Sequence, residues 1–98
     1  MTESNSSGLE GAAELFKTLG SPVRLAILRL LASGPMSVSI LAAQLDASQP
    51  LISQHLRVLR GQRLVSATRD GQQHIYAIAD EHVSHIVGDA IEHSKETP

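Results

Sequence analysis

The sequence predicts a mainly α-helical domain that carries one β-hairpin. Apolar residues recur at helical spacing in five stretches that cover most of the chain. Two short strand-like stretches, residues 64–69 and 73–78, flank Asp70-Gly71, a strong signal for a hairpin turn. Two of the short helices are joined by only a few residues, which is typical of a helix-turn-helix. A hairpin directly after such a unit is a wing, so the predicted fold is a winged helix-turn-helix.

Length and composition indicate one small globular domain. The 98 residues are 42% hydrophobic and 18% charged, and dimerisation would usefully add buried surface to a domain of this size. One Tyr, one Phe and no Trp require an aliphatic core. The absence of cysteine excludes disulfides and thiolate metal sites. No apolar run approaches a membrane span and residues 1–11 lack a signal pattern, so we expect a cytoplasmic protein that does not enter membranes.

The charge distribution favours a nucleic-acid partner more than the total charge does. The net charge is −2, which at first argues against such a partner. Residues 47–69, however, contain no acid and include Arg57, Arg60, Arg63 and Arg69. A local basic face is what phosphate contact requires, whatever the total charge.

The first two helices have recognisable ends. Residues 1–8 are polar and rich in Ser, and we expect a disordered tail there, followed by one DNA-binding and dimerisation domain over residues 9–98. A first helix is expected over residues 9–19. Ser21 fits the N-cap of a second helix with Pro22 in its first turn, and Gly34-Pro35 ends it.

The next two helices form the predicted helix-turn-helix. The third begins at Ser37 or Val38 and ends at Leu45, and Ser48 caps a fourth helix that Gly61 ends. Four apolar residues of the fourth helix are expected to point inward, namely Leu51, Ile52, Leu56 and Leu59.

The second helix of such a unit enters the major groove of DNA. The candidate DNA contacts are therefore polar residues of the fourth helix and an arginine at the tip of the wing: Ser48, Gln49, Ser53, Gln54, His55, Arg57, Arg60 and Arg69. Gln and Ser read bases or bind phosphate, whereas Arg57 and Arg60 suit phosphate. The alternative for each residue is ordinary helix surface, and the alternative for the unit is a plain helical hairpin. We interpret His55 and His74 as structural or surface residues, not metal ligands.

The last stretch, residues 80–96, predicts an acidic amphipathic helix that holds three of the five histidines. Asp80, His82, His93 and Glu96 are potential zinc ligands. His82 and His93 lie on nearly one face but roughly 16 Å apart along the axis, so one helix cannot close a site. Two antiparallel copies would join the first pair of one chain to the second pair of its partner, giving a homodimer with two sites. The first helix is a natural second partner in that interface, and a solvated acidic face is the alternative.

The order of the elements resembles the ArsR/SmtB family of bacterial metal-sensing repressors, over nearly the whole chain from about residue 9. The resemblance rests on LGSPVRLAILRLL (19–31), SQPLISQHLRVLR (48–60), DGQQHIYAI (70–78) and the Asp-x-His, His-x-x-Glu pattern at Asp80, His82, His93 and Glu96. It implies an allosteric homodimer that binds operator DNA when metal-free and releases it on binding zinc. The family's other common site places cysteines on the helix before the recognition helix. This chain has none there, so a lead, cadmium or arsenite sensor of that kind is not expected.

Three alternatives remain open from the sequence. Nickel or cobalt could replace zinc, with His85 as an extra ligand. The same fold could repress transcription under another signal or none. A zinc hydrolase is disfavoured because four protein ligands leave no position for water and HExxH is absent, so we expect no enzyme.

Overall fold

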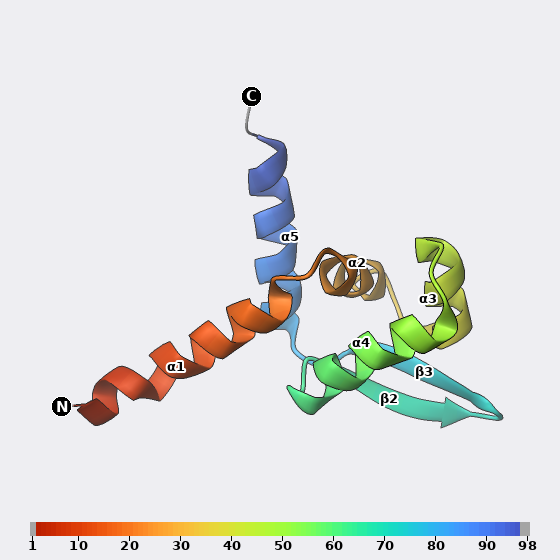
Figure 1. The fold of residues 1–98 in the computed structure, drawn as a ribbon, viewed down its shortest axis with the longest axis horizontal. Coiled ribbons are helices and arrows are strands. Elements are labelled where there is room, and N and C mark those ends of the chain that lie inside the picture. The colour runs from red at the N-terminus through yellow and green to blue at the C-terminus, as the bar shows by residue number, and fades with distance from the viewer. Residues whose placement is uncertain (1, 97–98) are drawn as a thin grey trace.

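The computed structural model describes residues 2–96, with side chains from residue 8 onward. Within these residues it contains five helices and three strands. They are α1 (Thr2–Leu19), α2 (Pro22–Leu31), β1 (Met36–Ser37), α3 (Val38–Leu45), α4 (Gln49–Gly61), β2 (Val65–Asp70), β3 (Gln73–Ile78) and α5 (Glu81–Lys95). Figure 1 shows α2, α3, α4 and the hairpin gathered into one body, from which α1 and α5 extend in different directions. The predicted mainly helical fold with a hairpin wing is confirmed.

Serine hydroxyls begin three of the helices, as the sequence predicts. Ser21 Oγ accepts from the Arg24 amide at 3.3 Å at the start of α2. Ser37 and Ser48 do the same for α3 and α4, each at 3.2 Å. Each hydroxyl satisfies one of the backbone donors that a helix start leaves without a partner, so these caps fix where the helices begin.

The strands form a three-stranded antiparallel sheet in the order β1-β3-β2. Asp70 pairs with Gln73, so the hairpin loop is Gly71-Gln72, one residue later than the predicted turn. Gly71 takes a φ of 67°, which a glycine adopts without steric cost. The sequence does not predict β1, because a strand of two residues is too short to show an alternating pattern.

The structure corrects one expectation for α4 and confirms another. Leu51, predicted to point inward, is 39% exposed. The buried line of the helix is Ile52, Leu56 and Leu59, and at about 100° per residue Leu51 falls well away from it. Gly61 is the last residue of the helix, as the sequence predicts. The left-handed conformation after the helix belongs to Arg63, with a φ of 63°.

The start of α1 also differs from the expectation. The helix begins at Thr2, where the sequence predicts a disordered tail over residues 1–8. Residues 2–7 are all polar, so no apolar spacing could predict helix there. Gly8, with a φ of 107°, interrupts regular helical geometry just before the predicted boundary at residue 9. Met1 lies outside the described residues.

The hydrophobic core lies where the body's helices meet the sheet, and the end of α1 and the first half of α5 contribute to it. Its buried members are Leu19, Ile27, Leu28, Leu31, Leu41, Ala42, Ile52, Leu56, Leu59, Leu64, Val65, Tyr76, Val83 and Val87. As the composition predicts, this core is aliphatic, with Tyr76 as its single aromatic member among the described residues. The chain's one phenylalanine, Phe16, is instead 59% exposed on α1.

The two terminal helices leave apolar surface uncovered in the single chain. Leu9 and Phe16 on α1 are 68% and 59% exposed, while Ile86 and Ile91 on α5 are half-buried. The Cα radius of gyration is 14.6 Å, against about 12.6 Å for a compact domain of this length. The excess comes from helices that project beyond the body (Figure 1). No helix of the described chain is long and apolar enough to cross a membrane.

Candidate DNA-binding surface and metal-ligand positions

The connection between α3 and α4 is built by local hydrogen bonds. Asp46 ends α3 in the left-handed conformation, with a φ of 53° and a ψ of 48°. The Ala47 amide donates to the Ala42 carbonyl at 2.9 Å, and Ser48 then caps α4. These bonds close a short turn, so α4 crosses α3 as the second helix of a helix-turn-helix.

Most of the predicted DNA contacts on α4 share its outward side. Ser48, Gln49, Gln54, Arg57 and Arg60 are exposed, and Ser53 is half-buried. Among the described residues, ion pairs join only Asp80 with His82 and Glu92 with Lys95. No carboxylate of the described residues therefore neutralises the arginines of α4, which are available to phosphate.

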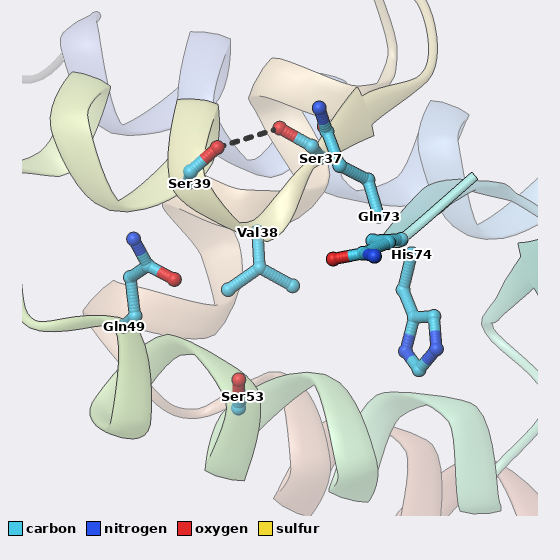
Figure 2. Close-up of a pocket in the computed structure, with 8 residues that line it drawn as sticks. Ser37, Val38, Ser39, Gln49, Ser53, Gln73 and His74 are labelled. Carbon is cyan, nitrogen blue, oxygen red and sulfur yellow. Dashed lines mark hydrogen bonds between the residues drawn. The ribbon is translucent and has the colours of Figure 1, made fainter. Parts of the chain in front are cut away.

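A groove runs between α4 and the wing. It consists of two adjoining hollows of about 370 and 560 Å³, which share Ser53 from α4 and His74 from β3. We call it the wing groove. Figure 2 shows the His74 ring extending from β3 toward α4, with Gln49 and Ser53 on the helix side and Ser39 above. Its lining supplies hydroxyl, amide, imidazole and guanidinium groups and no carboxylate.

The wing groove also contains residues that are not among the predicted DNA contacts. Ser39, Gln73 and His74 lie there beside the predicted Gln49 and Ser53. The alternation of the strand could have suggested His74, because it pairs with Arg69 on β2 and such partners share one face of a hairpin. Ser39 could not have been found in this way, since its place depends on how α3 packs against the sheet.

Arg69 lies near the tip of the wing, as predicted. It is exposed, and its Nε donates to the Gly71 carbonyl at 3.1 Å. This bond is made within the turn itself. It holds the side chain along the hairpin tip, from which the remaining guanidinium donors can reach a phosphate.

His55 lies apart from the other candidates on α4. Its half-buried ring faces α2, where Arg24 Nε donates to His55 Nδ1 at 3.1 Å. Burial of the ring and the neighbouring Arg24 guanidinium lower the pKa of His55 below 6.5. The ring is therefore held neutral, and only its second nitrogen remains for an outside partner.

The four predicted metal ligands lie in two pairs at opposite ends of α5. Asp80 is the N-cap, and its Oδ1 accepts from the His82 amide at 2.9 Å and lies 3.2 Å from His82 Nδ1. The His82 side chain is 95% exposed. At the other end, His93 and Glu96 are exposed, and Glu96 is the C-cap. No three metal-binding side chains come together within the described single chain, as the spacing along one helix predicts.

This donor set fits a divalent metal only if a second chain completes it. Two imidazoles and two carboxylates are suitable zinc ligands, and each pair is accessible. His85, the possible extra ligand, is also exposed on α5.

The geometry is that of a winged helix-turn-helix regulator, and comparison with known proteins identifies the family. The profile described as "Bacterial regulatory protein, arsR family" matches residues 21–67. The chain is 43% identical to an HTH-type transcriptional regulator of Methanocaldococcus jannaschii, over 80% of this chain and 89% of that protein. The chain belongs to the arsR family of bacterial regulatory proteins.

Two further similarities define its relatives. The chain is 41% identical to the HTH-type transcriptional repressor SmtB of Mycobacterium tuberculosis, over 90% of this chain and 65% of that repressor's length. It superposes with a TM-score of 0.83 and 30% identity on a homodimeric winged helix-turn-helix DNA-binding domain from Mycobacterium bovis, covering 94% of this chain and 85% of that one. The expectation of a regulator and not an enzyme agrees with these relatives, which are named as regulators.

Proposed function

We propose that this chain is a metal-responsive transcriptional repressor of the cytoplasm. It binds operator DNA as a homodimer when metal-free and releases the DNA on binding zinc at two intersubunit sites. One observation carries the proposal: four exposed ligand side chains lie in two pairs at the two ends of α5, a helix whose apolar face is only partly covered. A single chain can complete neither site, whereas an antiparallel pair of chains can complete both.

The DNA-binding part of the proposal rests on α4 and the wing groove. Gln49, Ser53 and Gln54 occupy the first half of α4, which is the part of a recognition helix that reaches base edges. Ser48, Arg57, Arg60 and Arg69 surround them with donors suited to phosphate. His74 adds a donor on the wing side of the groove. A direct contact of His55 with DNA would use its Nε2, because Nδ1 already accepts from Arg24.

The dimer is supported by the apolar surface of the terminal helices. Leu9 and Phe16 are large apolar side chains left exposed on α1. Helix α5 offers Ile86 and Ile91, with Gly88 between them and open space around its Cα. Covering these surfaces with a second copy removes apolar area from water, at roughly 25 cal/mol per Å². The twofold axis would pass near Gly88, where the absence of a side chain lets two helices approach closely.

The metal response requires that zinc favour one dimer shape over another. Zinc bound between the two α5 helices would fix their crossing angle, because its ligands come from both chains. Helix α5 packs on α2, and α2 packs on α4, so a change at the dimer interface shifts the separation of the two recognition helices. Operator affinity then falls when the zinc-preferred separation does not match the half-site spacing.

Fluorescence anisotropy with a duplex selected from a random library tests the proposal. The metal-free protein is expected to bind that duplex, and zinc is expected to release it. The His82→Ala/His93→Ala double variant should bind equally well and ignore zinc. The Asp89→Asn variant is the matched control, because Asp89 is an exposed acid of α5 outside the ligand pattern, and it should respond as the unmodified chain does. DNA binding that no metal affects would contradict the metal response, and no DNA binding in any state would overturn the function.

Nickel and cobalt are the alternative signals, and His85 distinguishes them. A tetrahedral zinc site is complete with four ligands, whereas nickel prefers more. The His85→Ala variant should therefore keep its response to zinc. Loss of a nickel or cobalt response in this variant, with no response to zinc in the unmodified chain, would favour the alternative metal.

A further inference from the structure

One side chain joins the end of α1 to the recognition helix. Arg24 lies in the first turn of α2, and its Nη1 donates to the carbonyl of Thr18, a buried residue of α1, at 3.2 Å. Its Nε donates to His55 Nδ1 on α4 at 3.1 Å. The Arg24 backbone is fixed as well, because its amide donates to Ser21 Oγ. A single guanidinium thus bridges three helices.

The chemistry of this bridge determines the tautomer and the charge of the His55 ring. A guanidinium has only donors, so His55 Nδ1 must supply a lone pair and the ring proton must lie on Nε2. A protonated ring would place two donors and two positive charges against each other. The lowered pKa of His55, caused by burial and then by Arg24, agrees with this arrangement.

We propose that Arg24 is a positioning residue for DNA recognition: through Thr18 and His55 it sets the placement of α4 relative to α1. This inference rests on the proposed function, in which α1 belongs to the dimer interface and α4 reads the operator. The two guanidinium bonds hold those helices in one geometry, so the separation of the recognition helices in the dimer depends on them. Lysine cannot replace this bridge, because one ammonium group lacks the planar, two-ended fork that reaches both acceptors.

The tautomer of His55 is tested without DNA. Long-range ¹H–¹⁵N NMR of the histidine rings, assigned by comparison with the His55→Asn variant, should show a neutral His55 ring at pH 7 with the proton on Nε2. In the Arg24→Lys variant the preference for this tautomer should weaken. A protonated His55 at pH 7, or a tautomer that Arg24→Lys leaves unchanged, would overturn the inference. This result does not depend on whether the chain binds DNA, so it separates a failure of the bridge from a failure of the proposed function.

The effect on recognition is tested by comparing specific and non-specific DNA. Arg24→Lys should lose about tenfold in affinity for the selected operator, the expected effect of losing a charged hydrogen bond, while affinity for random duplex changes little. Arg29→Lys is the matched control, because Arg29 is an exposed arginine of the same helix whose side chain makes no hydrogen bond among the described residues, and it should leave both affinities unchanged. Equal losses on operator and random DNA, or none, would contradict a positioning role.

Two substitutions of His55 keep the inference testable if the arginine variant folds poorly. Asparagine retains an oxygen acceptor near the place of Nδ1, so His55→Asn should lose less operator affinity than a variant without an acceptor. Leucine has similar bulk and no acceptor. His55→Leu should therefore lose about tenfold in operator affinity, because the charged Arg24 donor is left without its acceptor. Equal losses in the two variants would mean that His55 acts on the DNA directly and would overturn the role given to Arg24.

Discussion

The body and the terminal helices of this chain differ in whether one chain alone can build their proposed binding sites. In the body, α2, α3, α4 and the sheet enclose a buried aliphatic core, and the side chains proposed to contact DNA stand on the helices and strands around it. The terminal helices expose Leu9 and Phe16 and carry the two halves of the proposed metal site at the opposite ends of α5. The proposed DNA-binding surface is thus built by one chain, whereas the proposed metal site and its interface require two. A metal bound between the terminal helices of two chains can therefore change the placement of the body without unfolding it.

Core substitutions should lower the stability of the body most strongly. Leu56 is fully buried, so Leu56→Ala is expected to lower the free energy of unfolding by about 2–5 kcal/mol. Leu51 lies on the same helix and is 39% exposed, so Leu51→Ala should lower it by less than about 1 kcal/mol. Urea unfolding followed by circular dichroism measures both. Similar losses in the two variants would contradict the assigned orientation of α4.

A charge on α1 should weaken the proposed dimer without destabilising the body. Phe16→Glu would bury a carboxylate in the proposed interface, and we expect the dimer dissociation constant to rise about 100-fold. Ile40 is 49% exposed on α3, and Ile40→Glu should leave dimerisation unchanged. Sedimentation equilibrium distinguishes these outcomes. Dimers of unaltered strength in the Phe16 variant would place the interface elsewhere.

Acid should weaken the metal response before it affects the fold. Imidazole binds zinc only in its unprotonated form, so zinc affinity is expected to fall about tenfold or more between pH 7.5 and 5.5. Competition with a zinc-binding dye measures this change, with circular dichroism as a check on the fold. An affinity that is constant over that range would exclude His82 and His93 as ligands.

The smallest expected effect is the pH dependence of stability that comes from His55. Because its pKa is lowered in the folded chain, the unfolded chain takes up the proton at a higher pH. The free energy of unfolding is therefore not reduced by His55 above pH 6.5. It falls as the pH drops below that value toward the pKa of His55 in the folded chain. The His55→Asn variant should lose less stability over this range than the unmodified chain. An equal or larger loss would mean that His55 is protonated in the fold.

The body was largely predictable from the sequence because local chemistry determines it. The hydroxyls of Ser21, Ser37 and Ser48 act on amides three residues away, so the helix starts can be read from neighbouring residues. Long-range packing was less accessible. The orientation of Leu51 depends on which side of α4 meets the core, and β1 exists only because β3 passes beside Met36.

The candidate site divides along the same line. The positions of Asp80 and His82 at one end of α5, and of His93 and Glu96 at the other, follow from helical spacing and were predictable. The bridge from Arg24 to His55 joins residues 31 positions apart and depends on how α2 packs on α4. No periodicity in the sequence predicts such a contact.

The most direct measurement of the intersubunit site mixes two defective chains. Homodimers of His82→Ala and of His93→Ala each lack a ligand in both sites. In a heterodimer of the two, one site carries both substitutions and the other is intact. Unfolding and refolding the variants together, followed by zinc titration, should therefore restore tight zinc binding and zinc-dependent release of DNA that neither variant shows alone. A mixture that binds zinc no better than its separate components would contradict a site shared between two α5 helices.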